Sequence, residues 1–110
     1  MTQDDNKRKL YWLINHYLAD KISAEDFTSE YDRVYNIELD KDTLSHKEHD
    51  AFRNLSPIVG RFSPFEEDLM KYPGAYFTET ELRAKVIETK KILAEQFETY
   101  EIDQLINSWD

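Results

Sequence analysis

The chain has 110 residues, which is enough for one small domain with a single hydrophobic core. Only two glycines and three prolines are present while 14% of the residues are aromatic, a composition that argues against disorder and against a turn-rich β-sandwich. The formal net charge of −9 disfavours direct binding to nucleic acid or to an anionic membrane and favours encounter with a basic protein, and the absence of cysteine excludes disulfide and thiolate chemistry.

The N-terminal third of the chain predicts two helices. The first runs from about residue 4 to residue 19, and its apolar stripe at helical spacing consists of Leu10, Leu13, Ile14, Tyr17 and Leu18. Trp12 lies off this stripe, and we interpret it as a partly covered edge residue rather than as an anchor for a partner. The second helix begins after Ser23, which can cap it, and its stripe consists of Phe27, Tyr31, Val34 and Tyr35. A polar connection over residues 36–43 follows.

A third helix is predicted from Ser45 onward. Ser45 and Glu48 have the spacing of a capping box, and the apolar stripe that follows consists of Phe52, Leu55, Val59 and Phe62. Pro57 is expected to kink this helix or to mark a fresh start capped by Ser56, because proline removes a backbone donor and clashes with the preceding turn.

A short acidic helix is predicted next. Ser63 is expected to cap it, with Pro64 at its first helical position, and Tyr72-Pro73-Gly74 is expected to end it. Since this helix directly follows a buried stripe, it is expected to hold three consecutive acids in a fixed place: Glu66, Glu67 and Asp68.

The last helix is expected to begin at Thr78, with Glu81 completing a capping box. Its stripe consists of Leu82, Val86, Thr89, Leu93, Phe97 and Tyr100. Beyond residue 100 the apolar positions move to another face, which predicts a bend or a separate terminal turn; they are Ile102, Leu105, Ile106 and Trp109.

These elements predict one all-α domain over residues 1–110. No alternating apolar and polar run reaches the length of a strand between turn signals. The economical solution is an antiparallel four-helix bundle with a short extra helix after Ser63-Pro64 and a C-terminal helical extension. The first apolar run is too short for a signal peptide, and no stretch approaches the roughly 20 apolar residues of a membrane span. We therefore expect a cytoplasmic protein.

The sequence offers little for catalysis or metal binding. His46 and His49 lie three residues apart, and Asp42 or Asp50 could complete a metal shell, but we favour a solvated first helical turn because only His16 remains as a further histidine. No Ser-His-Asp order, phosphate-binding glycine loop or dinucleotide motif is present, and nothing singles out one pair of carboxylates. We predict no enzymatic activity, no cofactor and no metal.

The stretch from Pro64 to Leu82 has a marked charge imbalance. Its acids face only Lys71, and they are Glu66, Glu67, Asp68, Glu79 and Glu81. Such acids either keep the surface solvated or form a functional anionic surface, and composition does not decide between the two. Tyr72 and Tyr76 flank Pro73-Gly74 beside the acids and are candidate anchors of a protein contact; the alternative is a loop that folds back on the core.

Three motifs are similar to one known family. Residues 17–27, YLADKISAEDF, resemble the start of the second helix in colicin D-type immunity proteins. Arg61-Phe62-Ser63-Pro64 followed by acids is similar to the RF-x-P turn of that family, and residues 77–83, FTETELR, resemble the acidic start of its last helix. The similarity covers about residues 10–93 in the family's order and spacing, although Gly60, Ser63 and Phe65 stand where the family has acids around the turn.

The resemblance implies a helical bundle that neutralises a cognate toxin inside the producing cell. In the type member the toxin is a nuclease that cuts tRNA, and carboxylates of the immunity protein occupy its basic active site in place of RNA phosphates. Relatives are paired with contact-dependent growth inhibition toxins. For this chain the implied partner is the basic C-terminal nuclease domain of a toxin in a 1:1 complex, contacted by Glu66, Glu67, Asp68, Tyr72, Tyr76, Glu79 and Glu81. The alternative is an acidic helical adaptor that binds a non-nuclease partner through the apolar positions of residues 102–109.

Overall fold

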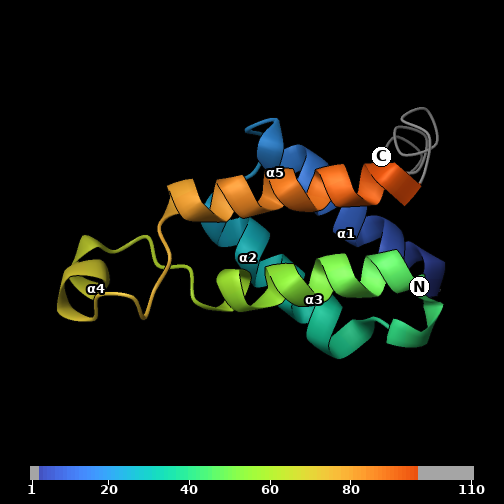
Figure 1. Cartoon of the computed structure of the whole chain (residues 1–110), viewed down its shortest axis with the longest axis horizontal. Coiled ribbons are helices and arrows are strands. Elements are labelled where there is room, and N and C mark those ends of the chain that lie inside the picture. Colours follow the sequence, from blue (N-terminus) through green and yellow to red (C-terminus); the bar gives the residue numbers. More distant parts are fainter. Residues whose placement is uncertain (1–2, 97–110) are drawn as a thin grey trace.

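The structure is a computed structural model that describes residues 3–96. Its main helices are α1 (Gln3–Leu18), α2 (Ala24–Arg33), α3 (His46–Gly60) and α5 (Glu79–Gln96), and its shorter elements are a π-helical turn η1 (Val34–Glu38), a 3-10 turn η2 (Lys41–Thr43) and α4 (Glu66–Lys71) (Figure 1). Over these residues no strand forms, and the only β-type pairing is an isolated bridge between Phe62 and Phe77. The predicted all-α class is confirmed.

The four main helices enclose one core. α1 packs against α2 and α5, and α3 packs against the same two helices, with the most extensive helix contact between α3 and α5. Figure 1 shows α3 and α5 side by side and running in opposite directions. None of the described helices is long and apolar enough to cross a membrane.

The predicted stripes supply most of this core. Fully buried side chains come from all four main helices and include Leu10, Phe27, Tyr31, Phe52, Leu55, Leu82, Val86 and Leu93. The Tyr31 ring is stacked on Tyr35, with ring centroids 5.5 Å apart, and also contacts Phe27 and Phe52. Trp12 is half-buried at the edge, as predicted, whereas the buried Tyr11 was missed because it lies beside the main stripe.

The predicted helix starts at Ser23, Ser45 and Thr78 are confirmed by their hydrogen bonds. The Ser23 hydroxyl accepts from the backbone N–H of Asp26 at 3.1 Å. At α3, Ser45 and Glu48 form a complete capping box, and the corresponding pair before α5 is Thr78 and Glu81. These caps fix where three of the four main helices begin.

The fresh helix start expected at Ser56 and the predicted cap of the short acidic helix are wrong. α3 continues through Pro57 to Gly60 as one helix. Proline leaves the Arg53 carbonyl without its helical partner, but both residues are exposed, so water can satisfy that carbonyl. α4 begins at Glu66 with Phe65 at its N-cap, so Ser63 does not occupy the cap and Pro64 precedes the helix. The predicted C-terminal extension, with Phe97 and Tyr100, lies outside the described residues.

Candidate functional site

The connection between α3 and α5 stands away from the helical body, and we call residues 61–78 the projecting loop (Figure 1). Two backbone hydrogen bonds close its base: Ser63 N–H donates to the Phe77 carbonyl at 3.1 Å, and Phe77 N–H donates to the Arg61 carbonyl at 2.8 Å. α4 lies within this loop and has no buried residue. The loop is therefore fixed at its base while its α4 end is presented to solvent.

Ser63 organises the start of the projecting loop, although in a different role from the predicted helix cap. Its hydroxyl accepts from the Phe65 N–H at 3.2 Å and donates to the Asp68 carboxylate at 2.8 Å. Ser63 is buried and Asp68 is half-buried. One of the three predicted acids is thus turned back into the loop, where it helps to set the loop's conformation.

Glu66 and Glu67 face solvent, as predicted. Both side chains are exposed in the first turn of α4, and within residues 3–96 neither forms an ion pair or a hydrogen bond through its carboxylate. Two adjacent carboxylates without an ion pair give the α4 end of the loop a negative potential, which Lys71 in the last turn of α4 offsets only in part.

The projecting loop also exposes apolar side chains. Tyr72 is 55% exposed and Tyr76 is 37% exposed, with ring centroids 6.2 Å apart in an edge-on arrangement. Gly74 adopts a φ of +82° between them, which supports the tight turn. The loop does not fold back on the core, so the alternative interpretation of these tyrosines is not supported. Phe65 and Met70, 65% and 73% exposed, join them and were missed, since a single apolar residue in a sequence is ordinarily assigned to the core.

The two remaining predicted acids lie in the first turn of α5. Glu81 accepts hydrogen bonds from the Thr78 N–H at 3.0 Å and from its hydroxyl at 3.1 Å, so its carboxylate stabilises the helix start. Glu79 is exposed and forms no ion pair within the described part of the chain. Of the five predicted acids, Glu66, Glu67 and Glu79 keep carboxylates that are available to a partner.

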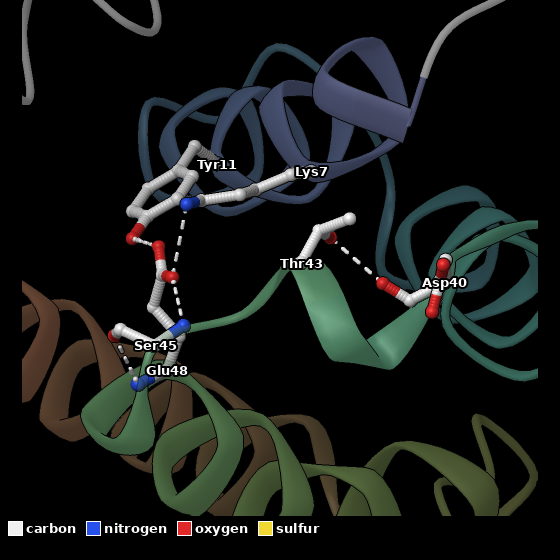
Figure 2. A network of polar contacts seen from close by, with 6 residues as sticks. All are labelled: Lys7, Tyr11, Asp40, Thr43, Ser45 and Glu48. Atoms are coloured by element: carbon white, nitrogen blue, oxygen red, sulfur yellow. Dashed lines mark hydrogen bonds and ion pairs between the residues drawn. The ribbon is translucent and has the colours of Figure 1, made fainter.

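A second polar cluster lies at the other end of α3 (Figure 2). The fully buried carboxylate of Glu48 accepts from the Tyr11 hydroxyl at 2.5 Å, from Lys7 at 3.0 Å and from the Ser45 N–H at 2.8 Å. Burial by itself raises the pKa of Glu48, but these hydrogen bonds and the positive charge of Lys7 outweigh it and hold the pKa below its ordinary value. This cluster joins α1 to α3, roughly 20 Å along α3 from the projecting loop, and it serves the fold.

The histidines beside this cluster do not assemble a metal centre. His46 lies 3.7 Å from Asp50 in an exposed pair on one turn of α3. Within residues 3–96, no three His, Cys, Asp or Glu side chains come together as metal ligands would.

The fold and the projecting loop define a small helical protein that presents carboxylates and aromatic rings on one loop. The family model described as bacterial self-protective colicin-like immunity matches residues 8–103, and the chain belongs to this family. It is therefore an immunity protein, whose partner is a toxin that it neutralises, and proteins of this family are generally not enzymes. No curated protein and no solved structure matches the chain.

Proposed function

We propose that this immunity protein neutralises a nuclease toxin of the colicin D or contact-dependent inhibition type, which cuts tRNA. The projecting loop places Glu66 and Glu67 in the basic active site of the toxin, where their carboxylates stand in for RNA phosphates. The observation that carries the proposal is the exposure of two unpaired acids on a loop that stands away from the helical body. The complex contains one copy of each protein and forms in the cytoplasm of the producing cell.

The charge of the protein suits such a partner. A nuclease has to bind a polyanion, so its catalytic cleft is basic, and a carboxylate can occupy a phosphate site without being cleaved. The net charge of −9 attracts a basic domain over long range, and the unpaired acids orient the encounter. Glu79 extends the negative surface from the loop onto α5, while Asp68 and Glu81 contribute through the local structure that they stabilise.

The exposed aromatic rings are expected to slow dissociation of the complex, which charge alone does not do. Electrostatic attraction raises the association rate, whereas slow dissociation depends on apolar and aromatic groups that lose water at the centre of an interface. Tyr72, Tyr76 and Phe65 lie on the same projecting loop as the acids. We propose that these rings pack against the toxin around the acidic contact.

The test uses the purified C-terminal domain of the cognate toxin. The immunity protein is expected to abolish tRNA cleavage by that domain at equimolar concentration. Association is expected to slow at least about tenfold between low and high salt, because the attracting charges are solvent-exposed and therefore screened. Stopped-flow fluorescence at several salt concentrations measures this rate. A salt-independent rate would contradict the electrostatic part of the proposal.

Competition tests whether the active site itself is blocked. An uncleavable tRNA analogue at saturating concentration is expected to prevent complex formation, because both ligands need the same cleft. If the toxin domain binds the analogue and the immunity protein together, the active-site mimicry is wrong even if neutralisation is observed.

The described structure does not test the adaptor alternative. Its apolar positions, Ile102, Leu105, Ile106 and Trp109, lie outside the described residues.

A further inference from the structure

Ser63 makes three hydrogen bonds that tie the far part of the projecting loop to its base. Its N–H donates to the Phe77 carbonyl at 3.1 Å, which helps to close the base. Its hydroxyl accepts from the Phe65 N–H at 3.2 Å and donates to the Asp68 carboxylate at 2.8 Å. The residue is only 5% exposed, so water has little access to compete for these bonds. One buried side chain therefore links the closed base of the loop to the first turn of α4.

α4 has little else that holds it in place. It has six residues, none of them buried, and Phe65 at its N-cap provides no side-chain cap. A helix of this length is not stable in water by itself, because forming the first turn is unfavourable and few further bonds follow. Among the hydrogen bonds and ion pairs described for residues 3–96, the contact of Ser63 with Asp68 is the one that joins a side chain of α4 to another part of the chain. The orientation of α4 therefore depends on this contact.

The exposed acids of α4 share a helical turn with Asp68. Glu66 and Glu67 precede it directly in the first turn. Because the Asp68 carboxylate is held by Ser63, the backbone that carries the two exposed acids is held with it. A binding loop that already has its bound conformation loses less conformational entropy on association, so its affinity is higher without any additional contact.

We propose that Ser63 is a positioning residue for toxin binding, whose hydroxyl holds the projecting loop in its binding conformation before the toxin arrives. Asp68 is the other half of this contact and acts through it, not as a third substitute for an RNA phosphate. The inference rests on the proposed function, since it takes Glu66 and Glu67 to be the acids that contact the toxin. It assigns two roles to three consecutive acids, of which two bind and one positions.

The free protein tests the positioning step without the toxin. Ser63→Ala and Asp68→Ala are each expected to speed hydrogen exchange of the Tyr72 N–H, which donates to the Asp68 carbonyl at 3.0 Å, about fivefold or more. The Phe77 N–H, which donates to the Arg61 carbonyl at the base, is the internal control and is expected to keep its exchange rate in Asp68→Ala. NMR measures both rates. Unchanged exchange at Tyr72 in either variant would overturn the inference, even if the protein neutralises the toxin.

Asp68→Asn separates the hydrogen bond from the charge. The side-chain oxygen of asparagine can still accept from the Ser63 hydroxyl, whereas the negative charge is lost. The Kd for the toxin domain is therefore expected to stay within about threefold of wild type. The matched control Glu67→Gln loses the same charge at an acid that contacts the toxin, and it is expected to raise the Kd at least about tenfold. If both variants weaken binding equally, Asp68 contacts the toxin itself, and the positioning role is wrong while the proposed function stands.

The kinetics of Ser63→Ala distinguish positioning from direct contact. The substitution lowers the fraction of free protein that has the binding conformation, so the association rate is expected to fall about tenfold while the dissociation rate stays within about twofold. Combining it with Asp68→Ala is expected to add little, because both substitutions remove the same contact. Stopped-flow fluorescence measures both rates. An unchanged association rate, or a loss of affinity that lies in the dissociation rate, would show that Ser63 does not position the loop.

Binding of the wild-type protein separates this inference from the proposed function. If the wild type binds the toxin domain and the variants fail the tests above, the positioning role is wrong and the proposed function stands. If the wild type does not bind the toxin domain, the proposed function is wrong and the positioning role is overturned with it.

Discussion

Replacing Glu48 with alanine is expected to lower the free energy of unfolding by about 3 kcal/mol, the scale for removing one partner of a buried ion pair. The substitution leaves the Tyr11 hydroxyl buried without its acceptor, removes the partner of Lys7 and breaks the capping box of α3. In a domain of this size, the thermal midpoint is expected to fall by roughly 10 °C or more. Urea titration followed by circular dichroism measures the change.

Glu88→Ala serves as the control, because Glu88 forms an exposed pair with Lys85 within one helix. Its removal is expected to change the free energy of unfolding by less than about 0.5 kcal/mol. An equal loss for both variants would show that the buried cluster has no special part in stability.

The contribution of Glu48 is also expected to depend on pH. Its folded-state pKa is lowered, so its stabilisation is complete above the ordinary value of 4.5 and is lost as the pH falls through the folded-state value. The difference in unfolding free energy between the wild type and Glu48→Gln is therefore expected to be constant near neutral pH and to shrink in acid. A difference that grows below pH 4.5 would contradict the lowered pKa.

Reversing the charges of Glu66 and Glu67 to lysine is expected to abolish protection against the toxin while the fold survives. Both side chains are exposed and unpaired within the described residues, and α4 buries none of its residues, so the core is untouched. Two lysines facing a basic cleft replace attraction with repulsion, which costs several kcal/mol and is expected to slow association by about 100-fold or more. Growth of cells that co-express the toxin domain, together with stopped-flow association, measures both effects.

Asp68 is deliberately left unchanged in this variant. Its carboxylate accepts from Ser63, so reversing it would alter the conformation of the projecting loop as well as its charge. The control reverses two acids elsewhere, Asp32 and Glu88, which gives the same change in net charge from the faces of α2 and α5. If this control loses protection equally, total charge matters and the projecting loop has no specific part.

Helix starts were predictable because capping is a local property. Ser23, Ser45 and Thr78 each lie three residues before an acid and close to an apolar stripe, and a few neighbouring residues decide such a cap. The prolines show the limit of local rules. Whether the helix restarts at Ser56 depends on whether the freed Arg53 carbonyl meets water, and that depends on which face of α3 the other helices cover.

The polar contacts that depend on distant residues were not predictable. Glu48 was identified as a capping residue, but its burial follows from Lys7 and Tyr11, which α1 brings from about 40 positions earlier in the chain. The exposure of the projecting loop was only partly predictable. Its acids indicate exposed positions, whereas Phe65 and Met70 are residue types that indicate burial in a core.

The closure of the projecting loop by main-chain bonds at residues 61, 63 and 77 has a consequence for how such a protein can be retargeted. Those bonds do not depend on the exposed side chains of Glu66 and Glu67, so under the proposed function substitutions there are expected to alter the recognised toxin while the base of the loop stays closed. The helical body would then act as a constant scaffold. Exchanging the segment between these bonds among relatives is expected to transfer the toxin specificity.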